Sequence, residues 1–295
     1  MNRIALIIPA YKHNYLAETL ESIAIQNLSN CHVYIGDDAS PYPIAEIVKK
    51  YEKRIPLTYT RFEENIGGRD LVAQWNRCVK LANDEKWIWL FSDDDIMCEG
   101  CIEKVRNYIN LHNEECDVYH INGTVIDNEN KELKIKTIVD FPEKLTPNEY
   151  LNHIISGRDN TWGINYVVRR KTIENCNGFV NFDLAWNSDR ASWLTFCFPN
   201  GIRTIPEARV LWRYSGVNIT SQKTDKLIYK RKLNARLDFL RWLRRNYLDV
   251  NRLNISNITI LIYSLRNFKG DKYVCLPFRF LVFIRSLKLL KFWSI

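Results

Sequence analysis

Residues 4–40 read IALIIPAYKHNYLAETLESIAIQNLSNCHVYIGDDAS, and this stretch decides the fold. Two short apolar runs, Ile4 to Ile8 and His32 to Gly36, have the length and composition of buried strands. Between them, residues 16–26 place apolar side chains at helical spacing. A strand, a helix and a second strand in this order form a unit with parallel strands.

The same alternation continues outward from this stretch. Further strands are predicted at Leu57 to Phe62 and Trp87 to Phe91, with helices at Pro43 to Tyr51 and Asp70 to Ala82. We therefore predict an α/β fold with a mainly parallel, Rossmann-like sheet that carries helices on both faces.

The pattern becomes irregular between Asp117 and Arg213. A hairpin is predicted around residues 127–130, and strands are predicted at 166–169 and 203–205. Beyond Ser221 the chain reads as helical, and one stripe carries the apolar residues Leu233, Leu237, Leu240, Leu243 and Tyr247.

Charge divides the chain into two parts. Residues 223–295 hold 17 Lys and Arg against 4 Asp, a net charge of +13, whereas residues 1–222 carry −5. We predict a catalytic domain at 1–222 and a basic helical C-terminal extension at 223–295. Nucleic acid, an acidic partner and an anionic membrane surface are the partners that such a basic segment suits.

The end of this extension mixes large apolar and basic side chains. Residues 276–295 combine Phe, Leu, Ile and Trp with Arg and Lys, which suits the interface of an anionic lipid leaflet. A terminal helix packed on the enzyme or on a partner subunit is the alternative.

Cysteine usage and the first residues bear on the compartment. The eight cysteines lack the spacing of a disulfide framework, so we read them as reduced thiols. The apolar run that starts at Ile4 is short and no small-residue cleavage site follows it, which favours a strand over a signal peptide. No run reaches the roughly 18 apolar residues of a membrane span. We expect a cytoplasmic protein that lies at the inner face of the membrane.

Polar residues follow three of the predicted strands. In parallel sheets of this kind, ligands bind beyond the carboxyl ends of the strands. The three clusters are Pro9, Ala10 and Tyr11, then Asp37, Asp38, Ala39 and Ser40, and finally Ser92, Asp93, Asp94 and Asp95. The sequence thus predicts one polar site at this edge of the sheet.

Carboxylates dominate two of these clusters. Three consecutive aspartates repel one another unless a cation is bound, and their oxygens suit Mn²⁺ or Mg²⁺, with coordination positions left for phosphate oxygens. A solvated acidic turn is the alternative. At the second cluster, a carboxylate suits the ring N–H of a nucleotide base, and an Asx turn or helix cap is the alternative.

The order of the motifs adds a resemblance. They are Ile7-Ile8-Pro9-Ala10-Tyr11, Gly36-Asp37-Asp38-Ala39-Ser40, Asn65-Ile66-Gly67-Gly68, Trp75-Asn76 and Ser92-Asp93-Asp94-Asp95. Over residues 1 to 215 this series resembles the family 2 glycosyltransferases with the GT-A fold.

The resemblance implies roles for individual residues. The first motif, with Pro9 and Tyr11, and Asp38 of the second motif would hold the nucleoside, and Arg69 would contact the base or the diphosphate. The family's Asp-x-Asp element maps to Asp93 with Asp94 or to Asp93 with Asp95. Asp94 is the preferred metal ligand, Asp95 is the alternative, and Asp93 would lie near the ribose.

The family's general base maps to Asp189. It lies in Trp186-Asn187-Ser188-Asp189-Arg190, where many relatives have Glu-Asp, so only the second acid is kept. A helix cap is the alternative role. The implied reaction is a single in-line displacement with inversion, in which Asp189 takes the acceptor's proton while the metal and Arg213 neutralise the leaving diphosphate.

The implied function is transfer of a sugar from a nucleotide sugar, with UDP the expected nucleotide, to a hydroxyl of a glycan or lipid-linked acceptor in surface-polysaccharide assembly. A sugar nucleotidyltransferase is disfavoured because residues 9–13 lack a glycine-rich phosphate loop. A nucleic-acid-binding protein would leave the strand-end aspartates without a purpose, so no nucleic acid is expected as a partner.

Overall fold

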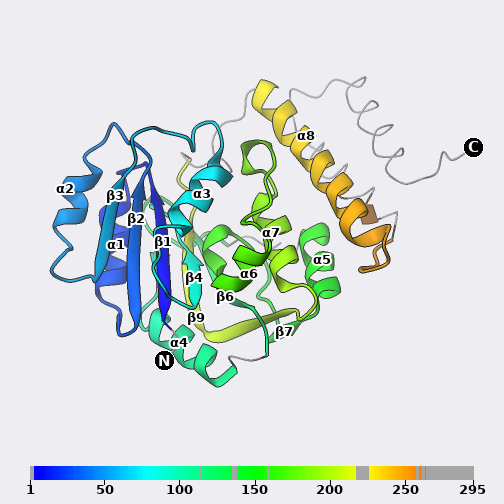
Figure 1. Ribbon diagram of the computed structural model, residues 1–295, viewed down its shortest axis with the longest axis horizontal. Coiled ribbons are helices and arrows are strands. Elements are labelled where there is room, and N and C mark those ends of the chain that lie inside the picture. The colour runs from blue at the N-terminus through cyan, green and yellow to red at the C-terminus, as the bar shows by residue number, and fades with distance from the viewer. Residues whose placement is uncertain are drawn as a thin grey trace, which may run out of the picture.

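A computed structural model describes residues 3–112, 115–134, 138–157, 160–216, 226–256, 259–260 and 263. Within these ranges a nine-stranded sheet carries helices on both faces (Figure 1). The strands are β1 Ile4–Ala10, β2 Cys31–Asp37, β3 Leu57–Arg61, β4 Trp87–Leu90, β5 Ile96–Met97, β6 Val118–Ile126, β7 Lys144–Leu145, β8 Tyr166–Arg169 and β9 Ile202–Arg213. Their order is β3-β2-β1-β4-β8-β6-β9-β5, and β7 pairs with β9. The predicted α/β fold is confirmed.

The first half of the chain follows the predicted β-α-β pattern closely. Strands β1, β2, β3 and β4 pair in parallel, and the helices between them are α1 Leu16–Ala24, α2 Ile44–Lys49 and α3 Leu71–Val79. Each predicted strand of this half is present and ends within three residues of its expected bounds. The carboxyl ends of β1, β2 and β4 therefore share one edge of the sheet.

The second half is a mixed sheet rather than a continuation of the parallel one. Strand β8 runs antiparallel between β4 and β6, while β6 and β9 are parallel to each other. The short strands β5 and β7 both pair antiparallel with β9. Because two reversals separate β4 from β6, the carboxyl ends of β6 and β9 return to the edge where β1 and β4 end.

Helix α5, Pro147–Ser156, was not predicted although the sequence signals its start. The Thr146 hydroxyl accepts a hydrogen bond from the Glu149 amide, and the Glu149 carboxylate accepts one from the Thr146 amide. Pro147 occupies the first helical position and Gly157, with φ of 66°, ends the helix. This is the capping box with a glycine C-cap, a pattern readable from sequence.

Two apolar layers flank the sheet. One contains buried side chains of α1, α2 and α4 Cys101–His112. The other contains those of α3, α5, α6 Arg170–Asn175, α7 Ser188–Cys197 and α8 Lys226–Leu243. Helix α7 thus lies on the face of the sheet that α3 also covers.

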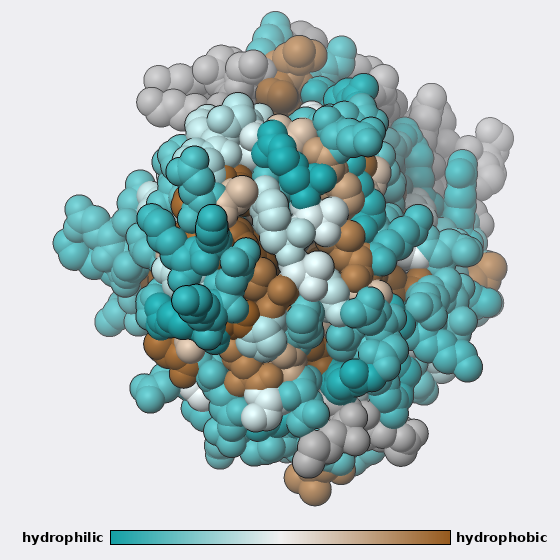
Figure 2. Space-filling model, turned by 60° about the vertical axis from the view of Figure 1, so that its left-hand side comes forward, coloured by the Kyte–Doolittle hydropathy of each residue, from teal (hydrophilic) through white to brown (hydrophobic). Residues whose placement is uncertain are grey.

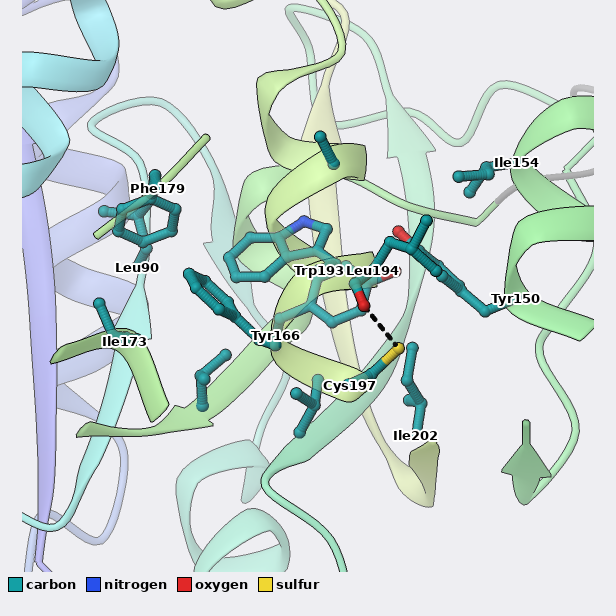
Figure 3. Close-up of a cluster of buried hydrophobic side chains, with 14 of the residues drawn as sticks. Leu90, Tyr150, Ile154, Tyr166, Ile173, Phe179, Trp193, Leu194, Cys197 and Ile202 are labelled. Carbon is teal, nitrogen blue, oxygen red and sulfur yellow. Dashed lines mark hydrogen bonds between the residues drawn. The ribbon is translucent and has the colours of Figure 1, made fainter. Parts of the chain in front are cut away.

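The core beneath α7 is rich in aromatic rings (Figure 3). Trp193 stacks on Tyr166 of β8 with ring centroids 4.5 Å apart, and Phe179 meets Trp193 edge-on at 5.7 Å. The Cys197 thiol donates to the Leu194 carbonyl at 3.4 Å within the helix. This packing fixes the orientation of α7 and so the position of its first turn.

The described part of the basic extension is a helix that belongs to the same core. All five residues of the predicted apolar stripe are buried, among them Leu237 and Leu240 at 1% exposure. Helix α8 packs against α7 and η2 Asp183–Ala185, and Figure 1 shows it to one side of α7. No helix within the described ranges is long and apolar enough to cross a bilayer. Residues 276–295 lie outside the described residues.

Most large apolar side chains are removed from the surface. On the face shown in Figure 2, hydrophilic side chains surround a central band of hydrophobic and intermediate ones. Three aromatic residues in the described ranges are exposed: Tyr214 at 45%, which follows β9, and the pair Tyr11 at 40% and Tyr42 at 43%. Tyr11 and Tyr42 follow strands of the parallel half, at the edge where the polar clusters were predicted.

Candidate active site

Hydrogen bonds join the ends of the first, second and fourth strands into one site. One carboxylate oxygen of Asp93 accepts from the backbone amides of Tyr11 at 2.9 Å and Lys12 at 2.8 Å. The Ser40 hydroxyl donates to the Tyr11 carbonyl at 2.6 Å. The predicted convergence of these strand ends is therefore present in the structure.

The three consecutive aspartates serve three different neighbours. Asp93 faces the loop after β1, Asp94 accepts from the Ser92 hydroxyl and pairs with Lys12, and Asp95 accepts from the Arg213 amide at 2.7 Å. All three are 4% exposed or less. The cluster is thus a buried, hydrogen-bonded array and not a solvated acidic turn.

Asp95 points into the protein. Its buried carboxylate bonds the Arg213 amide of β9, and its carbonyl accepts from the Thr19 hydroxyl of α1 at 2.8 Å. Burial, followed by the charge of Asp94, raises the pKa of Asp95 well above its usual value. The hydrogen bond from the Arg213 amide uses one Asp95 oxygen, and the alternative in which Asp95 ligates the metal stays a prediction.

Arg213 has a structural position that differs from its predicted role. The side chain is fully buried, and its guanidinium donates to the carbonyls of Asp94 at 2.8 Å and Asp127 at 3.1 Å and pairs with Glu18 at 3.0 Å. It also lies over the Tyr15 ring at 4.1 Å. We correct the prediction that Arg213 contacts the diphosphate: it is a positioning residue that holds the aspartate segment from behind.

A lysine supplies the positive charge that the aspartate cluster requires. The Lys12 ammonium lies 3.3 Å from an oxygen of Asp93 and forms a closer ion pair with Asp94. Burial lowers the pKa of Lys12, but the charges of Asp93 and Asp94 outweigh it and the net shift is upward. Sequence reasoning missed Lys12 because its partners are 81 and 82 residues away.

Asp38 anchors the Asn-Ile-Gly-Gly turn that follows β3. Its two oxygens accept from the amides of Ile66 at 2.9 Å and Gly67 at 2.8 Å, and Arg77 of α3 pairs with it. The Arg77 guanidinium also lies 3.8 Å over the Phe62 ring. A carboxylate offers about four acceptor positions, so these contacts leave one for a base. The predicted contact with a base stays a prediction.

Exposed aromatic and basic side chains border this site. Tyr11 meets Tyr42 edge-on at 6.4 Å, and the His13 ring stacks on Tyr42 at 4.3 Å. Arg69, which follows the turn held by Asp38, is exposed and pairs with Glu64 at 3.1 Å. Pro9 lies within β1, in register with Gly36 of β2. The predicted nucleoside-binding residues Pro9, Tyr11, Asp38 and Arg69 thus all lie around the shared strand edge.

Asp189 lies in the first turn of α7. Asn187 in the left-handed conformation precedes the helix without capping it through its side chain, and Asp189 accepts from the Arg190 amide at 2.8 Å. Asp189 is half-buried. The alternative role as N-cap does not fit, because Asp189 is the second residue of the helix. The Ser188 hydroxyl accepts from the Phe182 amide at 2.9 Å, so the residue before Asp189 has a structural role.

Helix α3 connects the turn held by Asp38 to the loop that leads into α7. The Asn76 side chain accepts from the Phe179 amide at 3.1 Å. Gly178 has φ of +90°, and a Cβ there would lie 2.3 Å from the Asn76 oxygen, so glycine is required. Asp70 caps α3 through the Ala73 amide and accepts from the Asn181 side chain. Asn76 of the Trp75-Asn76 motif thus has a structural role, which the sequence did not assign: it holds the loop that leads into α7.

One described cavity lies elsewhere. It has a volume of about 580 Å³ and is lined by Asn148, Arg244, Leu248, Asp249, Asn251, Arg252, Leu253, Asn254, Ile255 and Ile260. It contains none of the predicted site residues. Because ligands of parallel sheets bind beyond the carboxyl ends of the strands, we place the candidate active site at the aspartate array.

Comparisons with known proteins bear on the family to which the chain belongs. The model of glycosyl transferase family 2 matches residues 5–171. This chain is 29% identical to the minor teichoic acid biosynthesis protein GgaB of Bacillus subtilis over 120 residues, which are 40% of its length. Over 126 residues, 42% of this chain, it is 28% identical to the poly(ribitol-phosphate) beta-N-acetylglucosaminyltransferase TarS of Staphylococcus aureus. The matched parts span only 13% and 22% of these two proteins.

Solved structures give the same fold. The crystal structure of S. aureus TarS residues 1–349 matches 98% of this chain and 88% of that one, with a TM-score of 0.59 at 17% identity. The same fragment in complex with UDP-GlcNAc matches with a TM-score of 0.60 at 18% identity. With a family model that covers more than half of its residues and this shared fold, the chain belongs to glycosyl transferase family 2.

Proposed function

We propose that this protein transfers a sugar from a UDP-sugar to a hydroxyl of a glycan or lipid-linked acceptor, with inversion at the anomeric carbon. The observation that carries the proposal is the joining of three strand ends around Asp93, with Asp189 presented by a helix that is tied to the same edge. A nucleotide-binding edge and a carboxylate base are the two parts that a single displacement requires.

The donor side of the site supports a nucleotide. The exposed rings of Tyr11 and Tyr42 offer apolar faces to a base, and Arg69 offers a cation to a diphosphate. The names of solved relatives add support, because TarS has been crystallised with UDP and with UDP-GlcNAc. A UDP-sugar is therefore the donor that we propose.

The residues at the edge fit one divalent cation. Within the described ranges, no group of three His, Cys, Asp or Glu side chains is arranged to hold a metal alone. Asp94 nevertheless presents a carboxylate at the ligand edge, and Mg²⁺-type ions are often held by one or two carboxylates together with substrate phosphates. We propose Asp94 as the protein ligand for Mn²⁺ or Mg²⁺, with Asp93 near the ribose. The ion would offset the charge of the leaving diphosphate.

On the acceptor side we propose Asp189 as general base. Its carboxylate is half-buried and carried by a helix that Trp193 and Tyr166 fix in the core. It would remove the proton from the acceptor hydroxyl as that oxygen attacks the anomeric carbon from the side opposite the diphosphate. Attack from that side inverts the configuration.

The acceptor is proposed from chemistry and from relatives. GgaB is named for minor teichoic acid biosynthesis and TarS for transfer to poly(ribitol-phosphate). By analogy with these names, we propose a glycan polymer or its lipid-linked precursor as acceptor. The basic segment 223–295 is consistent with work near an anionic membrane surface.

A matched pair of variants tests this function. UDP-sugars would be screened calorimetrically and by donor hydrolysis, with Mn²⁺ and with excess chelator. We expect one donor to bind, and we expect Asp94→Asn to lose metal-dependent turnover by about 10²-fold or more while Asp95→Asn, which keeps its acceptor for the Arg213 amide, stays active. Full turnover in chelator would remove the metal from the proposal, and failure of every nucleotide sugar to bind would overturn the function.

A further inference from the structure

We infer that Lys12 is an internal counter-cation of the aspartate array, and that a divalent metal ion binds Asp94 more tightly once the nucleotide diphosphate draws the Lys12 ammonium away. The inference rests on the proposed function and concerns the order in which its two ligands bind. It assigns Lys12 as a positioning residue that couples metal binding to donor binding.

The first observation is where the ammonium lies. Both ion pairs of Lys12, to Asp93 and to Asp94, use the carboxylates that the nucleotide and the metal are proposed to contact. Arg213, a second cation near the array, donates a hydrogen bond to the backbone carbonyl of Asp94 and forms its ion pair with Glu18. The ammonium of Lys12 is therefore the charge in direct contact with the carboxylates.

The second observation is that Lys12 is held by its backbone and not by its side chain alone. Its amide donates to Asp93 at 2.8 Å, which fixes the Cα beside the array. The side chain remains 26% exposed, so it has an open route outward. Four side-chain bonds can rotate without movement of the loop. The ammonium can thus leave Asp94 while the nucleotide-binding loop stays in place.

Electrostatics then decides the order of events. An ammonium and a divalent cation on the same carboxylate repel each other strongly in a buried site. Metal binding to the nucleotide-free protein must therefore displace Lys12. A diphosphate brings several negative oxygens to the same edge, which gives the displaced ammonium a new partner and gives the ion further ligands.

Thermodynamic linkage makes the coupling between metal binding and UDP binding measurable. If UDP makes the metal bind more tightly by some factor, the metal must make UDP bind more tightly by the same factor. Removing the Lys12 charge should weaken this coupling, because the metal site would then be open before the nucleotide arrives. Lys12→Arg keeps the charge and should keep the coupling.

The test measures Mn²⁺ binding by the spin-resonance signal of the free ion, with no acceptor present. For the wild-type protein, UDP should tighten Mn²⁺ binding by roughly tenfold or more, within the range usual for coupled sites. For Lys12→Gln, Mn²⁺ should bind the nucleotide-free protein about tenfold more tightly than it binds wild type, and addition of UDP should change this less. Adding Asp94→Asn to Lys12→Gln should remove the gain.

Several outcomes would overturn the inference. Equal Mn²⁺ affinity of wild type with and without UDP would do so, and this comparison needs no variant. Equal nucleotide-free affinity of Lys12→Gln and wild type would also do so, provided that circular dichroism shows a folded variant. If Lys12→Gln does not fold, loss of coupling in the charge-preserving Lys12→Arg contradicts the inference. UDP titrations with and without Mn²⁺ separate the two levels: nucleotide binding without coupling sinks only this inference, while absence of nucleotide binding under both conditions sinks the proposed function.

Discussion

At the scale of single residues, the three consecutive aspartates of the site contact different partners. Asp93 organises the loop after β1, Asp94 faces the ligand edge and Asp95 ties the array to β9. Burial, with the like charge of Asp94, raises the pKa of Asp93 and Asp95. The shared charge is tolerated because backbone amides and Lys12 face the carboxylates.

The proposed base gives a prediction at this scale. Asp189→Asn keeps the shape of the side chain and removes its capacity to accept a proton, so turnover should fall by about 10² to 10⁴. Donor affinity should change little, because Asp189 is proposed to contact the acceptor hydroxyl and not the nucleotide. Steady-state kinetics together with UDP-sugar titration measures both. A variant that loses donor affinity and keeps turnover would show that Asp189 belongs to the donor site.

Sequence reasoning located the site residues at strand ends but could not assign their partners. The strand that precedes Asp93 is apolar and short, and its end is visible from composition alone. The partners Lys12 and Arg213 are up to 119 residues away in sequence, and only the folded chain brings them together. For this reason the sequence predicted that Arg213 contacts the diphosphate, whereas its buried side chain supports the aspartates.

At the scale of elements, the contact between α3 and the loop before α7 joins the two halves of the site. The Asn76 oxygen that accepts from Phe179 sits against Gly178, and Ser192 of α7 holds the Val180 amide at 2.8 Å. The loop is thus fixed from both sides. Its geometry sets where the helix that carries Asp189 begins.

Asn76→Ala tests this connection. It leaves the Phe179 amide without its acceptor, so the free energy of unfolding should fall by roughly 1 to 3 kcal/mol. We also expect kcat to fall while donor binding is kept, because the base would be held less firmly. Lys80→Ala, at the exposed end of the same helix, is the matched control and should change stability by no more than about 0.5 kcal/mol. Urea unfolding and kinetics on the two variants decide the matter.

Elements with a clean apolar period were predictable, and those with buried polar residues were not. Strand β6 was missed because His120 and Asn122 interrupt its apolar pattern. In the structure both are buried and paired: the His120 ring meets the Asn160 carbonyl at 2.7 Å, and Asn122 accepts from the Phe141 amide at 2.8 Å. A polar side chain with a partner from a distant segment reads as loop until that partner is known.

At the scale of the whole molecule, charge is separated along the chain. Residues 1–222 carry −5 and residues 223–295 carry +13. We predict that the full chain co-sediments with vesicles that contain anionic lipid, that salt weakens this binding, and that removal of residues 276–295 reduces it while UDP-sugar binding is kept. Neutral vesicles are the control. Equal sedimentation of the full and shortened proteins would favour the alternative, in which residues 276–295 pack on the enzyme or on a partner subunit.

The mixed second half of the sheet also belongs to this scale. Sequence predicted a mainly parallel sheet, because the β-α-β rhythm of residues 4–91 is regular and was extended to the rest. Strand direction depends on which strand lies next to which, and β8 enters between β4 and β6, which sequence order does not reveal. The fold class was thus readable from the chain, whereas the neighbours of each strand were not.

Helix α8 was predicted as part of an appendage, yet its apolar stripe completes the core that α7 begins. Phe239, Leu240 and Leu243 are each 1% exposed or less, and Phe182 packs edge-on against Phe239 at 6.1 Å. A protease that cut the chain once between residues 216 and 226 would therefore nick the protein without dividing it. The two fragments would remain non-covalently associated and would separate only when the core is unfolded.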